Sequence, residues 1–417
     1  MIAEIIAVGT ELLMGQINNT NARYISARFP DADVYVYYHT VVGDNPERLS
    51  ACLNHALERA DVVLTTGGLG PTQDDLTKET ISRALGLELI PDQKTLEDIH
   101  QFFKERGRVA APSNEKQGYF PEGAFILGNK NGTAPGCIIE KDDKIVIMMP
   151  GPPWEMEPMF EESVLPYFMK DARSRLYSVY LRMFGIGEST MEDRIKDLVS
   201  GQSNPTIAPY AKRGEITLRI TAKYNPGEEN PNQIIAPVLD EINNRLGEYI
   251  YSYKNEELHE KVAKMLIDNK CKIAVAESCT GGMLTSMLTD IPGISAVLDR
   301  SVVTYSYEAK VSVLGVNPDT LERVGAVSSE VAVEMAEGIR RTAGSDIGVA
   351  ITGIAGPGGG TAEKPVGLVY VALSCKEGTE VKKLNLWGDR DRIRHSTCLN
   401  ALDMVRKILQ KNETEES

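Results

Sequence analysis

The stretch KIAVAESCTGGMLTSML, residues 272 to 288, contains the patterns of a strand, a turn and a helix in succession. Its first four residues are an apolar run typical of a buried strand, and its last six follow a helical pattern. Between them, Ser278, Cys279 and Thr280 precede two glycines. Nucleophiles are often found at such a strand-to-helix turn, beside a helix N-terminus. The stretch therefore predicts an α/β fold around it and a candidate reactive group within it.

The composition limits the classes of protein to consider. A chain of 417 residues is too long for one ordinary core and suggests two or three domains. Apolar residues at 42% and charged residues at 25% are typical of soluble globular proteins, and no apolar run approaches the roughly 20 residues that span a bilayer. The formal charge of −14, without a basic cluster, disfavours direct binding to nucleic acid.

Cysteine usage and the N-terminus bear on the compartment. The six cysteines include no Cys-x-x-Cys pair, which disfavours a disulfide framework or a zinc site. The first residues lack the basic region of a signal peptide. We therefore expect a cytoplasmic protein that does not bind membranes.

Three regions differ in their pattern of strands and helices. Residues 1–172 alternate apolar strands with amphipathic helices, which predicts a parallel sheet covered on both faces. Residues 173–253 follow the order β-α-β-β-α-β of a split βαβ module and contain no reactive cluster. Residues 254–417 begin with an amphipathic helix and end in a helix from about Asp391 to Lys411. We expect an α/β domain, a small α+β spacer or interface module, and a second α/β domain.

A serine nucleophile needs a base, for which histidine and lysine are the candidates. None of the five histidines has a compelling position. Lys310 lies about one turn into an expected helix that follows an expected buried strand, Val302 to Tyr305. Because parallel strands end at one edge of a sheet, we expect this lysine near Ser278, where burial would favour its neutral form. Tyr305 is placed to relay a proton or to hold the lysine.

Two alternatives stay open on spacing alone. Small residues at a strand-to-helix turn are often needed only for packing, and a lysine at this helix position is usually solvated. Cys279 is a second candidate nucleophile, although cysteine is most often a small buried hydrophobic residue.

Two further turns of the third region suit an anionic substrate. AITGIAGPGGG, residues 350 to 360, runs from an expected strand into glycines, so Thr352, Gly353 and the following amides are candidates to bind an oxyanion or a phosphate. GDRDRIR, residues 388 to 394, offers Asp389 as a helix cap and Arg390 as a planar phosphate ligand. Together with a serine and a lysine, these features suggest hydrolysis of a small phosphorylated amide.

The first region has a glycine-rich turn of its own, TTGGLGPTQDDLT, residues 65 to 77. Its glycines allow backbone amides to approach an anion, and a helix N-terminus follows. Asp74 and Asp75 would place carboxylates beside a bound phosphate, where a divalent cation would screen the repulsion. The alternative is that both aspartates only favour the helix dipole.

Long motifs resemble those of the competence/damage-inducible protein CinA family over essentially the whole chain. In the third region these are AESCTGG, VTYSxxAK, GAVS, TGIAGPGGG followed by KPVG, and GDRDxIR. They resemble the C-terminal nicotinamide mononucleotide deamidase domain of that family. In the first region they are GTELLMGQINNTN (9–21), TTGGLGPTQDDLT, NGTAPG (131–136) and PGPPWEM (150–156), which resemble its N-terminal, molybdopterin-binding-like domain.

For the third region, the resemblance implies hydrolysis of nicotinamide mononucleotide to nicotinic acid mononucleotide and ammonia. It implies Ser278 as nucleophile, Lys310 as base and Tyr305 as a further catalytic residue, with no cofactor. The chain departs from the family at Tyr307, where relatives often have asparagine, which leaves the roles of the two tyrosines open. The substrate-binding positions implied are Glu277, Thr280, Gly281, Thr352, Gly353 and Arg390.

For the first region, the resemblance implies an ADP-ribose pyrophosphatase that depends on Mg, Mn or Co. Asp44 and Asp75 match the metal-binding positions. The nucleotide-binding positions implied are Glu11, Gly67, Gly68, Gly70, Asn131, Thr133 and Gly151. The alternative is a non-catalytic nucleotide- or pterin-binding module within a competence or DNA-damage scaffold. We also expect a homo-oligomer, of which a dimer is the simplest form.

Overall fold

The computed structural model describes residues 1–170, 174–211 and 213–415. The chain forms two compact units, one of Met1–Tyr177 with Ala222–Ile234, the other of Ser178–Thr221 with Ile235–Ser417. The domain boundary expected at residues 172 and 173 lies outside the described residues, and the three-domain division stays a prediction.

A six-stranded sheet forms the centre of the first unit. The strand order is β2-β1-β3-β8-β7-β6. The bounds are β1 Ile2–Val8, β2 Tyr35–Val42, β3 Val62–Thr66, β6 Phe125–Leu127, β7 Gly136–Lys141 and β8 Lys144–Met149. The first four strands of that order are parallel to one another, as expected. In contrast, β7 pairs antiparallel with β8, and β6 pairs antiparallel with β7. Asp142 and Asp143 both have positive φ, 50° and 60°, and form the tight hairpin that reverses the chain there.

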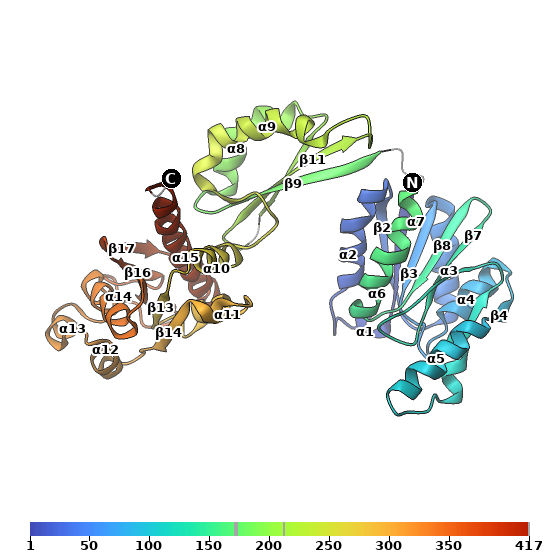
Figure 1. Ribbon diagram of the computed structural model, residues 1–417, viewed down its shortest axis with the longest axis horizontal. Coiled ribbons are helices and arrows are strands. Elements are labelled where there is room, and N and C mark those ends of the chain that lie inside the picture. The colour runs from blue at the N-terminus through green and yellow to red at the C-terminus, as the bar shows by residue number, and fades with distance from the viewer. Residues whose placement is uncertain (171–173, 212, 416–417) are drawn as a thin grey trace. The chain divides into compact units, whose positions relative to one another are not determined.

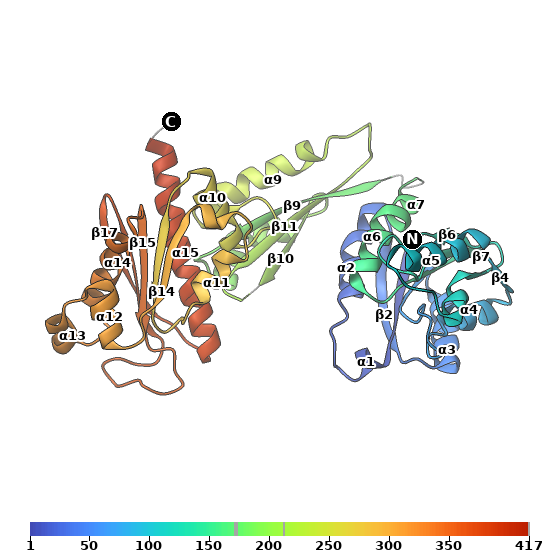
Figure 2. The ribbon, with the colours of Figure 1, turned by 60° about the horizontal axis from the view of Figure 1, so that its bottom comes forward.

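Helices cover both faces of this sheet (Figures 1 and 2). One face packs through Ile25, Phe29 and Phe160, the other through Leu53 and Ile81. The helices are α1 Thr10–Leu13, α2 Thr20–Arg28, α3 Pro46–Arg59, α4 Thr77–Leu85, α5 Gln93–Glu105, α6 Pro153–Met159 and α7 Leu165–Met169; β4 Leu89–Pro91 and β5 Tyr119–Pro121 form a small ribbon. The expected α/β architecture is confirmed.

The middle of the chain follows the expected β-α-β-β-α-β order. Its elements are β9 Arg175–Met183, α8 Glu188–Ser200, β10 Thr206–Ala211, β11 Ile216–Tyr224, α9 Pro231–Leu246 and β12 Ile250–Ser252. The strands form one sheet in the order β10-β11-β9-β12. Lys212, in the expected turn between β10 and β11, lies outside the described residues.

A buried polar cluster joins this module to α10 (Leu258–Asp268) within the second unit. Arg182 is fully buried, and its guanidinium donates to the Tyr251 hydroxyl at 3.0 Å and to the Glu215 carboxylate at 3.3 Å. The same carboxylate accepts from the backbone N–H of Leu258 at 3.3 Å. Because a buried charge is costly without partners, this cluster fixes how α10 begins.

A five-stranded sheet in the order β14-β13-β15-β16-β17 forms the centre of the C-terminal region. The bounds are β13 Ile273–Glu277, β14 Leu298–Val303, β15 Ile347–Gly353, β16 Leu368–Cys375 and β17 Gly378–Asn385. The first three strands of the order are parallel, and β16 and β17 are antiparallel. We expected a buried strand from Val302 to Tyr305; a strand is present there, but its expected end and its expected burial are wrong. It ends at Val303 and lies at the sheet edge, where its side chains have fewer neighbours and Val303 is 51% exposed.

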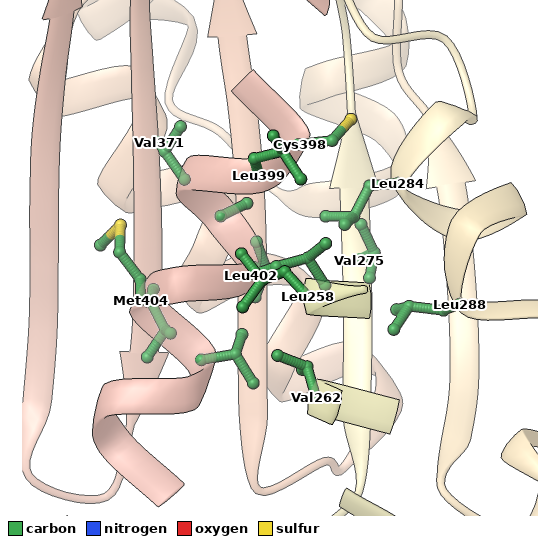
Figure 3. Packing of buried hydrophobic residues seen from close by; sticks show 14 of the residues in the cluster. Leu258, Val262, Val275, Leu284, Leu288, Val371, Cys398, Leu399, Leu402 and Met404 are labelled. Atoms are coloured by element: carbon green, nitrogen blue, oxygen red, sulfur yellow. The ribbon is translucent and has the colours of Figure 1, made fainter. Parts of the chain in front are cut away.

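The C-terminal helix α15 (Arg390–Glu415) is anchored by its apolar side chains. Leu399 and Leu402 of α15 lie beside Leu258 and Val262 of α10 on one face of the sheet (Figure 3). The opposite face packs against α14 Ser329–Ala343, α12 Tyr307–Leu314 and α13 Pro318–Val324, while α11 Met283–Thr289 contributes Leu284 and Leu288 to the same cluster as α10 and α15. The start of α15 is thereby held in place, together with its arginines.

Candidate active sites

Ser278 and Lys310 meet at the carboxyl edge of the C-terminal sheet. Ser278 directly follows β13, and Lys310 lies in α12, whose N-cap Ser306 accepts a hydrogen bond from the backbone of Ala309. The distance from Lys310 Nζ to Ser278 Oγ is 3.2 Å. The lysine side chain is fully buried, whereas the serine is partly exposed. A reachable hydroxyl group thus lies within hydrogen-bond distance of a buried amine.

The remaining contacts of Lys310 are compatible with its neutral form. Nζ also lies 2.6 Å from the carbonyl oxygen of Thr304 and 3.4 Å from that of Tyr305. A neutral amine has two N–H groups for these carbonyls and keeps its lone pair for the Ser278 hydroxyl. Burial lowers the pKa of Lys310, and the nearby Cys279 opposes this only in part. The Lys310 amine is therefore a candidate proton acceptor for the Ser278 hydroxyl.

The two tyrosines differ in what they touch. Tyr305 contacts the lysine through its main-chain carbonyl, while its side chain is 63% exposed. The Tyr307 hydroxyl accepts from the backbone N–H of Ala326 at 3.2 Å. Tyr305 therefore holds the lysine, and Tyr307 fixes the loop before α14; a proton relay through Tyr305 stays a prediction.

Glu277 holds the turn at residues 278–282, the candidate nucleophile turn. Its carboxylate is fully buried and accepts from the backbone N–H groups of Gly282 (3.0 Å), Leu284 (3.1 Å) and Thr285 (2.9 Å). These amides lie at the N-terminus of α11, so the carboxylate takes the place that an anionic ligand would occupy there. The geometry thus gives Glu277 a positioning role, whereas sequence alone placed it among substrate-binding residues.

Arg394 supports the same turn from α15. Its Nη2 and Nε donate to the carbonyl oxygen of Thr280 at 2.6 and 3.2 Å. Gly281 has a φ of +60°, which favours glycine, and its N–H donates to the Ser278 carbonyl at 3.1 Å. The Thr280 hydroxyl is buried and has no hydrogen-bond partner among residues 1–170, 174–211 and 213–415. Arg394 ends the motif GDRDRIR, in which Arg390 is the phosphate ligand expected from the sequence.

The glycine-rich loop after β15 borders the turn. The Thr352 hydroxyl donates to the Ala326 carbonyl at 2.8 Å, and a Cβ at Gly353 would lie 2.6 Å from a methyl group of Val369. Arg390 Nη1 donates to the Gly356 carbonyl at 2.7 Å. Thr352 and Gly353 therefore shape the loop, and Arg390 is placed beside it.

Cys279 lies within this polar site but is itself buried. Burial raises the pKa of its thiol to about 11, although the positive charges of Arg390 and Arg394 lower it. Both arginines therefore lie near the nucleophile turn, while the thiol stays protonated at neutral pH. The geometry favours Ser278 over Cys279 as the nucleophile.

The first unit contains a second candidate site, a cavity of about 690 Å³ at the carboxyl ends of β1 and β3. It is lined by eight of the nine residues expected there: Glu11, Asp44, Gly67, Gly68, Gly70, Asp75, Thr133 and Gly151. The ninth, Asn131, is not in the lining, and its side-chain amide donates to the Trp154 carbonyl at 2.8 Å.

Two glycines of this cavity have no room for a side chain. A Cβ at Gly67 would lie 2.2 Å from the Val8 carbonyl oxygen, and one at Gly68 would lie 2.1 Å from the Thr77 hydroxyl. The Gly67 N–H donates to the Met149 carbonyl at 3.0 Å. Any phosphate nest must therefore use the amides that follow Gly67.

Asp44 and Asp75 suit a cation that is shared with a substrate. The Asp44 carboxylate accepts from the backbone N–H and hydroxyl of Thr10 at 2.9 and 2.8 Å, and the Asp75 carboxylate accepts from the backbone N–H of Thr72 at 3.0 Å. Within the described ranges, no group of three or more His, Cys, Asp or Glu side chains is arranged to hold a metal unaided. Two carboxylates fit Mg²⁺, which commonly takes its other ligands from water and phosphate.

Three family models match successive parts of the chain. The "Probable molybdopterin binding domain" matches residues 4–170, the "Damage-inducible protein CinA KH domain" matches 178–252, and the "CinA C-terminal domain" matches 255–409. A protein of Acetivibrio thermocellus named as a competence-damage inducible protein is 58% identical over 411 residues, which are 99% of each chain. The chain belongs to the CinA family.

A second relative that matches over nearly the whole chain agrees with this assignment. A CinA-like protein of Kosmotoga olearia is 51% identical over 98% of this chain and 99% of its own. A crystal structure of the competence/damage inducible protein CihA from Agrobacterium tumefaciens is 41% identical, covers 37% of this chain and 97% of that chain, and has a TM-score of 0.35. The family and the α/β fold class expected from the sequence are confirmed. Among the described residues, no helix is both long and apolar enough to cross a membrane.

Proposed function

We propose that the C-terminal domain hydrolyses nicotinamide mononucleotide to nicotinic acid mononucleotide and ammonia, with Ser278 as nucleophile and Lys310 as base. The observation that carries the proposal is the 3.2 Å approach of a fully buried lysine amine to a partly exposed serine hydroxyl. Release of ammonia from this nucleotide by the purified protein is the experiment that tests it.

In the proposed first step, Lys310 takes the hydroxyl proton while Ser278 Oγ attacks the carboxamide carbon. The oxyanion is stabilised by the backbone N–H groups of Cys279 and Thr280, because those of Gly281 and Gly282 already donate to Ser278 and Glu277. Lys310 then returns the proton to the departing nitrogen, which leaves as ammonia. Water hydrolyses the acyl-serine with the same lysine as base and restores the hydroxyl.

Arg390 is the residue that we assign to the substrate's 5′-phosphate. Among the described residues its guanidinium makes one hydrogen bond, to the Gly356 carbonyl, and the residue is exposed. Its planar guanidinium can therefore turn to a phosphate without losing a buried partner. Arg394 is less available because its Nε and Nη2 already donate to the Thr280 carbonyl.

Arg390→Ala should therefore raise KM for nicotinamide mononucleotide and change kcat little, since the phosphate is remote from the reacting carbon. Arg390→Lys should recover only part of the affinity because the bidentate contact is lost. Steady-state kinetics of the three proteins measures this. An unchanged KM in both variants would place the phosphate elsewhere.

The rate should also depend on the protonation of Lys310. Burial lowers the pKa of Lys310, and the base is active only when neutral, so kcat/KM should rise with pH through this lowered pKa. The ascending limb should lie below the pKa of an exposed lysine. A pH profile with soluble nucleotide substrate measures it; a rate that falls over the same range would contradict a lysine base.

For the N-terminal domain we propose a divalent-metal-dependent ADP-ribose pyrophosphatase. The cavity joins two carboxylates, Asp44 and Asp75, to the glycine turn at residues 67–70. A bound Mg²⁺, Mn²⁺ or Co²⁺ would screen the pyrophosphate charge and polarise the phosphoryl group. The alternative is a nucleotide- or pterin-binding module without catalysis, in which case AMP would not be released from ADP-ribose.

A direct role in nucleic-acid binding has less support. The segment matched as a KH domain, residues 178–252, lacks the Gly-x-x-Gly loop with which KH domains clamp nucleotides. The chain also carries a formal charge of −14. We propose that this module is a spacer or interface in a homo-oligomeric protein. The whole chain has six cysteines, all of them free thiols and none within this module, from which we infer a reducing cytoplasm.

A further inference from the structure

The mouth of the N-terminal cavity carries an exposed tryptophan that the proposed chemistry does not use. Trp154, in the first turn of α6, lines the cavity and is 66% exposed. Tryptophan is highly buried on average, so an indole left open beside a cavity is unusual. Ile17, which is 53% exposed, and Leu12 line the same cavity. These side chains give it an apolar portion that phosphates and metal would leave uncovered.

Hydrogen bonds fix the segment that carries this tryptophan. Asn131 donates to the Trp154 carbonyl at 2.8 Å, and Asn129 donates to the neighbouring Glu155 carboxylate at 2.6 Å. A Cβ at Gly132 would lie 2.1 Å from a Glu155 carboxylate oxygen, so the two segments are closely packed. The indole is therefore presented on a held backbone, which reduces the entropy that a ligand must overcome.

We propose that Trp154 is the stacking platform for the adenine base of the nucleotide bound in this cavity. The inference rests on the proposed function of the N-terminal domain. The carboxylates and glycine turn account for the pyrophosphate, and the apolar portion is left for the one flat aromatic part of ADP-ribose. A purine has a π face that an indole attracts, whereas the second ribose has none.

Loss of such a stack should weaken binding by a measurable amount. Stacking of a base on an aromatic side chain is worth about 1–3 kcal/mol on replacement by alanine, or roughly 5- to 140-fold in Kd. Trp154→Ala should weaken AMP binding by a factor in this range and leave ribose 5-phosphate binding unchanged. Trp154→Phe should recover part of the affinity. Because the side chain is mostly exposed, we expect all three proteins to fold alike.

The composition of the chain provides a direct optical test. The protein has two tryptophans, Trp154 and Trp387. Trp387→Phe therefore leaves Trp154, in the N-terminal domain, as the only indole. AMP and ribose 5-phosphate, the two products of ADP-ribose cleavage, are titrated with Mg²⁺ into this full-length variant. AMP should quench the Trp154 emission and ribose 5-phosphate should not.

Calorimetry with AMP and with ADP-ribose separates the inference from the function on which it rests. If Trp154→Ala binds AMP as tightly as the unaltered protein, the stacking inference is wrong and the nucleotide site survives. If the unaltered protein binds neither AMP nor ADP-ribose, the proposed function of the cavity fails and the inference fails with it.

Discussion

Replacing either Ser278 or Lys310 with alanine is expected to lower kcat for amide hydrolysis by roughly 10³-fold or more. Each variant removes one half of a proton-transfer pair whose atoms lie 3.2 Å apart. The double variant should be little worse than either single one, because the two side chains act as a unit. Steady-state ammonia release measures all three rates.

Matched variants separate chemistry from folding. Lys310 is fully buried, so Lys310→Met, which keeps most of the side-chain volume, should be as inactive as Lys310→Ala while disturbing packing less. Cys279→Ala should keep most activity, since burial raises the pKa of its thiol to about 11 and leaves little thiolate. Iodoacetamide should likewise inactivate slowly. An inactive Cys279→Ala beside an active Ser278→Ala would overturn the assignment.

Removal of divalent metal should affect only one of the two proposed activities. EDTA is expected to abolish cleavage of ADP-ribose and to leave amide hydrolysis unchanged, because the proposed Ser278–Lys310 chemistry uses no metal whereas Asp44 and Asp75 alone offer a cation too few ligands. Both reactions are followed on one full-length preparation, with AMP and ammonia as the products measured.

Readdition of metal is the control for this experiment. Mg²⁺, Mn²⁺ or Co²⁺ should restore AMP release, and Asp75→Asn should prevent the restoration while amide hydrolysis continues. Loss of both activities on chelation would contradict the assignment of two independent sites. Retention of both would remove the metal from the N-terminal mechanism.

The sequence predicted the parts of the C-terminal site that depend on local patterns. The helix that contains Lys310 was expected after Tyr305, and it runs from Tyr307 to Leu314 between a serine N-cap and a following glycine. The approach of Lys310 to Ser278 followed from the rule that parallel strands end at one edge of a sheet.

Other features depend on partners that are distant in sequence. Whether the strand before Tyr305 is central or at an edge depends on how many strands pair with it, and periodicity does not contain that number. The direction of the Glu277 carboxylate is fixed by the amides of α11, and that of Arg394 by the Thr280 carbonyl, 114 residues away. From the sequence alone, Glu277 could either bind substrate or position the turn. Its hydrogen bonds in the folded chain favour the positioning role.

The N-terminal cavity shows the same division. The glycines at 67, 68 and 70 were recognisable as a cluster after an expected strand. The fold adds the reason for each, since a Cβ would meet the Val8 carbonyl at Gly67 and polar side-chain atoms at Gly68 and Gly70. Trp154 was not singled out, although it lies within the quoted stretch PGPPWEM, because its exposure beside a cavity is a property of the folded chain alone.

The most direct test of the central claim is ammonia release from nicotinamide mononucleotide by the full-length protein in EDTA. We predict equal amounts of ammonia and nicotinic acid mononucleotide from the unaltered protein, and only background release from folded Ser278→Ala at the same concentration. No ammonia from the unaltered protein, or equal release by the two proteins, would contradict the account.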